Sequence, residues 1–449
     1  MRLTGNAERL YQDIRDLPIV SPHGHCDPSW FAKDTPFANP AELLVIPDHY
    51  VFRMLYSQGI PLEDLGIRGG ADPRAVFRLF CKNWHLFLGT PSRGWLQYVF
   101  EETLGLETKP SADTADELYD QISEKLALPE FRPRALFQRF NIETLATTDH
   151  ATDLLNHHDA MHGSAWSGRV IPTFRPDGVL DPSFPDFRAN IKQLETVSGV
   201  EITTYSSFLT ALRQRREAFR ARGATATDHA IETVHTEWIE DPEPLFQQAR
   251  SGEIAAKDCA RFYGHMLIEM AQMSVEDGMT MQIHGGSRRN TNHLVMSAFG
   301  RDKGADIPVA TDWVRGLEAL LNRVGNSNAF KLILFTLDES TYARELAPMA
   351  GHWPALRIGP PWWFHDSAAG IARYFDSVVE TAGYHNLAGF NDDTRAFLSI
   401  PARHDLWRRA SALHLSQQVE AGFFDMSDAA YLAKLLATDL ARDAYGLSA

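Results

Sequence analysis

The 449-residue sequence contains only three cysteines, Cys26, Cys81 and Cys259. They are widely spaced and odd in number, so they do not predict a disulfide framework. Disulfides are rare in the reducing cytosol, and this cysteine usage therefore predicts a cytoplasmic protein. Residues 1–8 contain no apolar core of the kind that a secretory signal peptide needs, which agrees with that expectation.

Long apolar runs and an excess of positive charge are also missing. No stretch approaches the roughly 18 apolar residues of a membrane span. The 58 acidic residues outnumber the 43 basic residues, which gives a net charge of −15. Nucleic acids and anionic membranes attract basic proteins, so we expect neither as a partner. An anionic small molecule would need a local group of arginines to overcome this overall charge.

The sequence lacks the Gly-x-Gly-x-x-Gly turn that is typical of nucleotide-binding, doubly wound sheets. Instead, short β-like runs alternate with helical stretches such as 256–276 and 312–324. This alternation is typical of parallel strands joined by helices. Eight runs predict an α/β fold with a (β/α)₈ TIM-type barrel, and an open doubly wound sheet is the alternative. The runs cover residues 17–20, 142–147, 169–174, 224–233, 279–284, 331–336, 355–359 and 387–390.

One long segment does not fit the alternation. Residues 28–140 have a helix-like pattern, which predicts a helical insertion between the first strand region (1–27) and the rest of the barrel (141–449). The helical pattern over 404–445 is expected to cover the outside of the barrel. A loop that follows a barrel strand lies at the face where active sites form, so the insertion is placed to cap a substrate. Large apolar insertions often pack against partners, which makes a homo-oligomer a further expectation.

Polar residues follow several predicted strands, and His23-Gly24-His25 after the first strand is the most informative group. Residues i and i+2 of a strand point to the same face, so both imidazoles can face one point. Asp392 or Asp393, after the last run, would add a carboxylate. Three such ligands with an open position suit a divalent metal such as zinc. The alternative for the aspartates is a pair of helix N-caps.

Two arginines also follow predicted strands. Arg175 comes after the third strand and Arg395 after the eighth. A guanidinium can bind a carboxylate through two parallel hydrogen bonds. Ordinary surface ion pairing explains either arginine alone, but two at the same end of a barrel predict an anionic substrate.

The insertion contains a third polar group, Asp48-His49-Tyr50. His49 and Tyr50 are residue types that move protons between oxygens. The alternative interpretation is a helix start, with Asp48 as its N-cap. Near the seventh strand, Trp362 and Trp363 predict an apolar surface for one face of a sugar, with core packing as the alternative.

Taken together, these segments resemble the uronate isomerases, also called glucuronate isomerases, of the amidohydrolase superfamily. The matching segments occur in the order of the family and span nearly the whole chain. They are SPHGH at 21–25, DHYVFR at 48–53, TTD at 147–149, PTFRPD at 172–177, QIH at 282–284, WWF at 362–364 and DTRAFLS at 393–399.

The resemblance implies a (β/α)₈ barrel and the conversion of D-glucuronate to D-fructuronate and of D-galacturonate to D-tagaturonate. The reaction moves a proton from C2 to C1. Residue by residue, His23, His25 and Asp393 match the metal ligands, and the metal of the family is typically zinc. Asp393 is also the first choice for the base that removes the carbon-bound proton. His49 and Tyr50 match active-site groups that move protons between the sugar oxygens.

The resemblance further implies a hexuronate-binding set. Arg175 and Arg395 match substrate-binding arginines, and His284 and Trp363 are expected beside the substrate. His284 also matches a superfamily position that can bind a metal. Most amidohydrolases carry a bridging lysine on the fourth strand, whereas this sequence has Thr-Asp-His at 227–229, so one metal is expected and not two.

Two other functions use the same residues. A mononuclear metal-dependent hydrolase of the same superfamily would use His23, His25 and Asp393 to activate water. A sugar-acid binding protein without catalytic activity would use the arginines alone. The Asp48-His49-Tyr50 group and the two arginines favour the isomerase, because a generic hydrolase needs neither.

Overall fold

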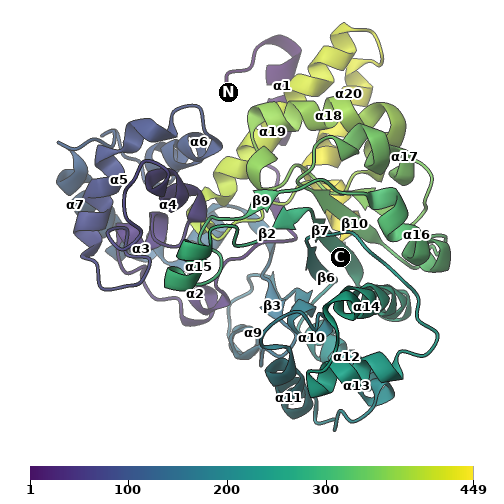
Figure 1. Ribbon diagram of the computed structural model, residues 1–449. Coiled ribbons are helices and arrows are strands. Elements are labelled where there is room, and N and C mark those ends of the chain that lie inside the picture. Colours follow the sequence, from purple (N-terminus) through teal and green to yellow (C-terminus); the bar gives the residue numbers. More distant parts are fainter. Residues whose placement is uncertain (448–449) are drawn as a thin grey trace.

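Parallel strands in barrel order form the centre of the protein, which the computed structural model describes for residues 1–447 (Figure 1). The spatial order is β1-β2-β4 in one sheet and β3-β5-β6-β7-β10-β11 in the other. β2 and β3 are successive parts of one strand, as are β4 and β5, so the two sheets form one wall. This is the order that the sequence predicted. The strands are β1 (Ile19–Ser21), β2 (Ile142–Ala146), β3 (Asp149–His150), β4 (Val170–Ile171), β5 (Phe174–Arg175), β6 (Ala226–Ile231), β7 (Thr280–Gly285), β10 (Leu332–Thr336) and β11 (Leu356–Ile358).

The eighth predicted run differs from the other seven. Residues 387–390 form a single parallel bridge, between Ile358 and Leu387, and no regular strand. Gly389 has a φ of +77°, outside the extended region, and a Cβ there would lie 2.5 Å from the backbone nitrogen of Ala441. The close approach of the C-terminal segment therefore requires glycine and interrupts the strand.

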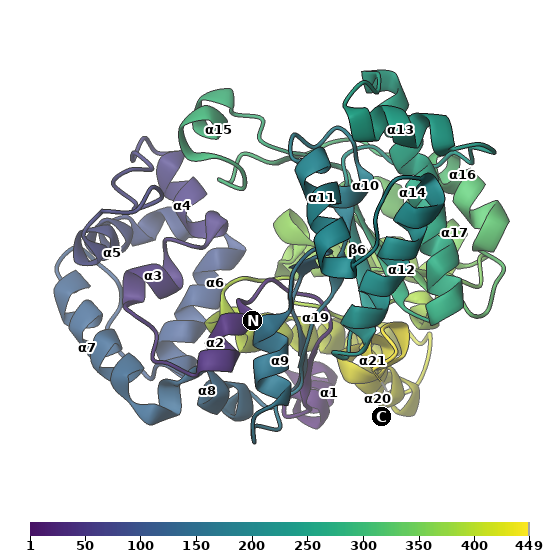
Figure 2. The same ribbon diagram turned by 90° about the horizontal axis from the view of Figure 1, so that it is seen from below.

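Residues 28–139 contain only helices among their regular elements, as the sequence predicted, and these form a separate lobe beside the barrel (Figures 1 and 2). The lobe has its own buried cluster of leucine, phenylalanine and valine side chains. Its domain boundaries at residues 27 and 140 stay a prediction. The helices are α2 (Pro28–Lys33), α3 (Pro40–Leu44), α4 (His49–Tyr56), α5 (Pro73–Lys82), α6 (Pro91–Tyr98), α7 (Ala115–Ala127) and α8 (Pro133–Arg139).

Four helices of this lobe begin with the same pair of residues, an N-cap residue followed by proline. In α2, α3, α5 and α6 a capping residue precedes a proline at the first helical position, in the pairs Asp27-Pro28, Asn39-Pro40, Asp72-Pro73 and Thr90-Pro91. Each capping side chain accepts a hydrogen bond from a backbone N–H of the first turn. Proline fixes φ near the helical value and has no N–H to leave unpaired, so the pair sets where each helix begins.

Helices also surround the barrel, and none within residues 1–447 is both long and apolar enough to cross a bilayer. The predicted stretch 256–276 is α14, and 312–324 is α16 with Asp312 as its N-cap. The outer helices are α1 (Gly5–Ile14), α9 (Asn156–His162), α10 (Asp177–Leu180), α11 (Phe187–Ser198), α12 (Tyr205–Arg220), α13 (Glu243–Ser251), α14 (Ala256–Asp277), α16 (Trp313–Val324), α17 (Ala347–Ala350), α18 (Ala368–Ala382), α19 (Ile400–Glu420) and α20 (Met426–Lys434).

The last helix, α21 (Leu440–Ala444), does more than cover the outside. Its alanines and the following Tyr445 pack with strand residues of the barrel interior. The Tyr445 hydroxyl donates to Gln282 Oε1 at 2.9 Å, and Thr280 Oγ1 donates to the carbonyl of Ala444. Because Thr280 begins β7, α21 closes the amino-terminal end of the barrel and leaves the other end open.

A long excursion after β7 crosses from the barrel to the lobe. It contains the short antiparallel pair β8 (Ser287–Arg288) and β9 (Ile307–Pro308), with α15 (His293–Phe299) between them. Figure 2 shows α15 between the lobe and the barrel helices. Arg68 of the lobe donates two hydrogen bonds to the carbonyl of Ala298, at 2.9 and 2.6 Å. The excursion therefore joins the two parts above the open end of the barrel.

Candidate active site

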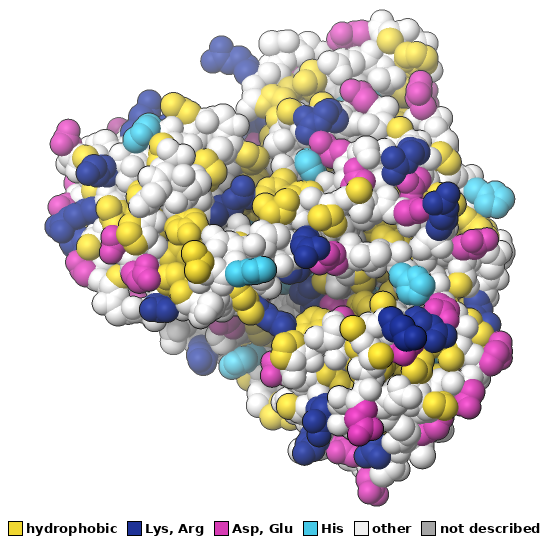
Figure 3. Space-filling model, in the orientation of Figure 1, with side chains coloured by type: hydrophobic (Ala, Val, Ile, Leu, Met, Phe, Trp, Pro, Cys, Tyr) yellow, Lys and Arg dark blue, Asp and Glu magenta, His cyan; other side chains and the backbone are white. Residues whose placement is uncertain are grey.

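A cavity of about 620 Å³ lies at the carboxyl ends of the barrel strands, against the helical lobe. The surface is hollowed between these two parts, and Lys and Arg side chains lie at its rim (Figure 3). Every residue that the sequence predicted for the site lines this one cavity, although the roles of these residues stay a prediction. They are His23, His25, His49, Tyr50, Arg175, His284, Trp363, Asp393 and Arg395.

The predicted metal ligands face one another. Nε2 of His25 lies 3.0 Å from Oδ1 of Asp393, and Nε2 of His23 lies 3.4 Å from the same oxygen. The three ligand atoms lie within 4.8 Å of one another. Burial acts to raise the pKa of Asp393, but the two imidazoles overcome it and hold this pKa well below its usual value. Two imidazoles and an ionised carboxylate around one point are a donor set that fits a divalent metal.

Asp392, the other aspartate considered from the sequence, faces away from the metal ligands. Its Oδ2 lies 3.1 Å from Nε2 of His404 on α19, and both side chains are buried. Asp393 has a φ of +40°, in the left-handed region of the backbone. Neither aspartate caps a helix, because the next helical element begins at Phe397. The structure therefore selects Asp393 as the candidate ligand.

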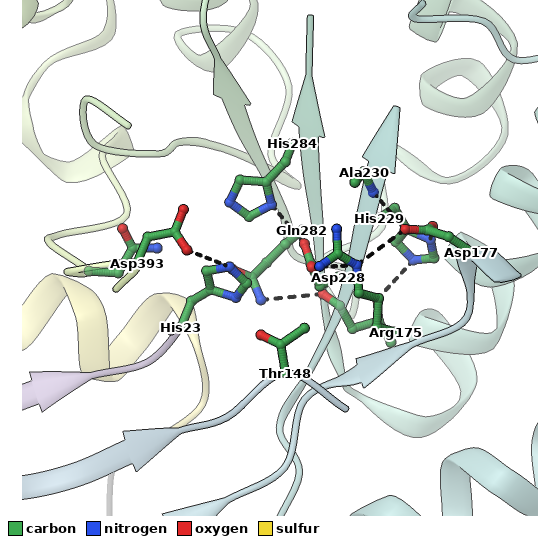
Figure 4. Close-up of polar contacts among 12 residues, drawn as sticks. His23, Thr148, Arg175, Asp177, Asp228, His229, Ala230, Gln282, His284 and Asp393 are labelled. Atoms are coloured by element: carbon green, nitrogen blue, oxygen red, sulfur yellow. Dashed lines mark hydrogen bonds and ion pairs between the residues drawn. The ribbon is translucent and has the colours of Figure 1, made fainter. Parts of the chain in front are cut away.

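A second group of possible ligands lies beside the first and shares His23. It contains His284 of β7 and Asp228 of β6. Nδ1 of His284 lies 2.7 Å from Oδ1 of Asp228, and the other oxygen of Asp228 lies 3.4 Å from Nε of Arg175 (Figure 4). Both oxygens of Asp228 already have partners, so this group fits a metal less well than the first. Asp228 instead holds Nδ1 of His284, which leaves Nε2 without a partner.

The two predicted arginines differ in their surroundings. Arg175 forms ion pairs with Asp228 and Asp177. The Nε of Arg175 lies 3.4 Å from the Oδ2 atom of each. Burial acts to lower the pKa of Arg175, but Asp228 and Asp177 outweigh it and raise this pKa. Arg395 lines the cavity, is exposed, and forms no ion pair with any carboxylate of residues 1–447. Arg395 is therefore the arginine that is free to bind an anionic substrate.

His49 and Tyr50 reach the cavity from the first turn of α4. Asp48 caps this helix and accepts from the backbone N–H of Tyr50 at 2.9 Å, so the predicted helix start is confirmed. The His49 and Tyr50 rings stack with centroids 4.8 Å apart. Burial, and then the charge of Asp366, raise the pKa of Tyr50 well above its usual value, so its hydroxyl keeps its proton at neutral pH.

Burial, followed by the charges of Arg395 and Arg53, lowers the pKa of His49 from 6.5 to about 3. Between these values the unfolded chain binds one more proton than the folded chain. The stabilisation from a neutral His49 is therefore complete above about pH 6.5 and is lost as the pH falls toward 3.

We expect the free energy of unfolding of His49→Gln to depend less steeply on pH between 4 and 6, by up to about 1.4 kcal/mol per pH unit. Urea unfolding at several pH values measures this slope. His293→Gln, which changes an exposed histidine of α15, should keep the original slope. An unchanged slope in His49→Gln would contradict the lowered pKa.

Aromatic side chains form one wall of the cavity. Trp362 and Trp363 are buried, and Trp363 packs edge-on against His49 with ring centroids 5.4 Å apart. Trp363 has a φ of +53°, which is rare for a bulky residue. The guanidinium of Arg289 lies 5.5 Å from the Trp363 ring, which the sequence gave no reason to expect. Both tryptophans pack in a buried cluster, which confirms the core-packing interpretation, and both also line the cavity. Their contact with a sugar stays a prediction.

Two acidic residues of the site were not predicted. Asp228 pairs with Arg175 and His284, and Asp177 accepts from Ala230 N at 3.0 Å and from the Tyr263 hydroxyl at 2.9 Å. The available signal was a carboxylate within the apolar run 224–233, because a buried strand rarely keeps an unpaired charge.

Comparison with known proteins gives matches over nearly the whole chain. A family model described as glucuronate isomerase matches residues 2–442. The uronate isomerase of Rhizorhabdus wittichii is 55% identical over 443 residues, covering 98% of this chain and 95% of that protein. The crystal structure of glucuronate isomerase from Caulobacter crescentus matches with a TM-score of 0.97 and 47% identity, over 99% of this chain and 94% of that chain. The crystal structure of a uronate isomerase from Thermotoga maritima matches with a TM-score of 0.93 and 26% identity, over 99% of this chain and 100% of that chain. These matches bear out the predicted α/β fold class.

Proposed function

The chain belongs to the glucuronate isomerase family, and we propose that it interconverts D-glucuronate with D-fructuronate and D-galacturonate with D-tagaturonate. One observation carries the proposal: His49 and Tyr50 as candidates for proton transfer, a candidate metal site and the unpaired Arg395 line a single cavity. A hydrolase needs only the second of these three groups. An aldose–ketose isomerase of an acidic sugar has a use for all of them.

We infer that His23, His25 and Asp393 hold one divalent ion, with zinc as the best match to two nitrogens and one oxygen. When bound, such an ion polarises a carbonyl or hydroxyl oxygen of the sugar. The fit is supported by Asp393 Oδ1, a buried oxygen that accepts no hydrogen bond although the Nε2 atoms of His25 and His23 lie 3.0 and 3.4 Å from it.

The expected metal content is one zinc per chain, measured on protein purified with added zinc. His25→Gln should lose most of this zinc, because two ligands bind far more weakly than three. His150→Gln is the matched control, since His150 lines the cavity and pairs with Thr152 outside the ligand group. Equal zinc content in both variants would remove His25 from the ligand set.

Substrate binding begins with the carboxylate. Arg395 is the candidate for this contact because it is unpaired, and a guanidinium can bind both carboxylate oxygens. Arg175 is held by Asp228 and Asp177, so we assign it to hydroxyl oxygens of the sugar through its remaining N–H groups. Trp363 offers an apolar surface to one face of the sugar chain.

The reaction moves hydrogen within the substrate and leaves its composition unchanged. A base removes the C2 proton, the C1 carbonyl becomes a hydroxyl through an enediol, the C2 hydroxyl becomes a carbonyl, and C1 gains a proton. Asp393 is ionised and is our candidate base. Tyr50 keeps its proton and can donate it to the enediolate oxygen that forms at C1 when the C2 proton leaves. Neutral His49, stacked on Tyr50, can then move protons between O1 and O2.

The experiment for this function is an NMR assay of each hexuronate with metal-free and zinc-loaded protein. We expect D-fructuronate to form from D-glucuronate and D-tagaturonate from D-galacturonate, and each aldose to form when its ketose is supplied. A panel of amide, ester and lactone substrates should give no product. Hydrolysis of the panel without any ketose would favour the metal-dependent hydrolase.

We also propose a reducing, cytoplasmic location, supported by Cys26, Cys81 and Cys259, which are all buried and free in the structure. Assembly into a homo-oligomer stays a prediction.

A further inference from the structure

Arg403 of α19 is a buried cation just behind the cavity. Its side chain is only 2% exposed, and it is not among the residues that line the cavity. Nη1 lies 2.6 Å from Oδ2 of Asp366, which follows β11. A buried ion pair gives little net stability, because desolvation offsets its attraction. Its other contacts therefore indicate what the arginine does.

The guanidinium of Arg403 lies over two aromatic rings of the helical lobe. Its guanidinium carbon is 3.5 Å from the ring centroid of Trp95 on α6 and 5.5 Å from that of Tyr50 on α4. The Trp95 ring meets the Tyr50 ring edge-on, with centroids 5.5 Å apart at 87°. Arg403 and Trp95 thus hold the Tyr50 ring from outside the cavity, while Tyr50 itself lines it.

The same guanidinium reaches the turn that carries Asp393. Nη1 donates to the carbonyl oxygen of Asp392 at 3.3 Å, and Nε donates to Ser399 Oγ at 3.2 Å. The hydroxyl of Ser399 donates in turn to the carbonyl of Ala396 at 2.8 Å. Asp393 lies between these contacts in a left-handed conformation, with a φ of +40°.

We propose that Arg403 is a positioning residue that fixes the Tyr50 side chain relative to Asp393. This role rests on the proposed function, in which Tyr50 and Asp393 move protons on the same substrate. Arg403 is suited to it because a planar, forked cation can lie on a ring and donate in two directions at once. A lysine keeps the charge but cannot make these contacts together.

Arg403→Lys tests the proposal in two backgrounds. In the otherwise unchanged enzyme we expect kcat to fall by about 10- to 100-fold, because misplacement of a catalytic group by about 1 Å costs that much. In a Tyr50→Phe background, which has no hydroxyl left to position, the same substitution should lower kcat by a clearly smaller factor, because only the support of the turn that carries Asp393 is then lost. Equal losses in both backgrounds would overturn the proposal, because a general structural role acts on both alike.

Arg408→Lys is the matched control. Arg408 is also buried on α19, but it donates to the carbonyls of Arg15, Leu17 and Pro18, before β1. It should lower stability without lowering kcat by more than about threefold. If Arg403→Lys does not fold, the double variant Arg403→Met with Asp366→Asn replaces it, because this variant leaves no unpaired buried charge.

A crystal structure of Arg403→Lys separates this proposal from the proposed function. We expect the Tyr50 ring to be displaced relative to Asp393, and this result does not depend on which substrate is used. An unchanged placement of the ring would overturn the inference even if the enzyme isomerises hexuronates. Absence of turnover in the unsubstituted enzyme would instead count against the proposed function alone.

Discussion

Replacing Asp393 with asparagine is expected to lower kcat for hexuronate isomerisation by at least about 10³-fold. The amide keeps the shape of the side chain, but it cannot accept a proton from carbon and it is a poor metal ligand. Steady-state kinetics with D-glucuronate, together with the zinc content of the variant, measure both effects. A fall in kcat with full zinc content would assign the loss to the base.

Asp392→Asn is the control for this experiment. Asp392 is adjacent in sequence and more deeply buried, and its carboxylate faces His404 and not the cavity. We expect its kcat to change by less than about threefold while its thermal stability falls. Similar small losses of kcat in both variants would remove Asp393 from the mechanism.

The second large effect is expected from Arg395→Met. If Arg395 binds the substrate carboxylate, losing this charged contact removes roughly 1.5–3 kcal/mol of binding, which lowers kcat/KM for D-glucuronate by about 10- to 150-fold. With D-glucuronamide, which carries no charge, the same substitution should change kcat/KM by less than about threefold. The comparison of acid and amide therefore isolates the carboxylate contact.

Arg288→Met provides the matched control, because Arg288 lies on β8, is exposed, pairs with Glu232 and does not line the cavity. It should leave kcat/KM for both substrates unchanged. A loss of the same size with acid and amide in Arg395→Met would mean that Arg395 supports the site in another way.

Much of the fold could be predicted because strand and helix periodicity are local properties. The runs around His23, Arg175 and His284 became strands or strand ends, and their polar residues met because barrel strands converge. The interruption of the eighth strand, at residues 387–390, could not be predicted from local periodicity. This interruption depends on the close approach of Ala441, about fifty residues later in the chain.

The pairing within the site was less accessible from the sequence. Asp392 and Asp393 are adjacent and identical in type, so the sequence does not distinguish them. In the structure, Asp393 has a left-handed backbone and its carboxylate faces the histidines. Asp228 reaches His284 because β6 and β7 pair with Asp228 opposite Gln282, and register is a tertiary property. Asp228 also pairs with Arg175. The sequence therefore did not show which of the two arginines is free to bind substrate.

The central claim is that this cavity removes the C2 proton of an open-chain hexuronate. Incubating D-glucuronate with zinc-loaded enzyme in D₂O and following the sugar by ¹H NMR tests it directly. We predict that the C2 proton signal disappears as the ketose forms, and that Asp393→Asn abolishes both changes. A C2 proton signal that persists, with no ketose, would contradict the account.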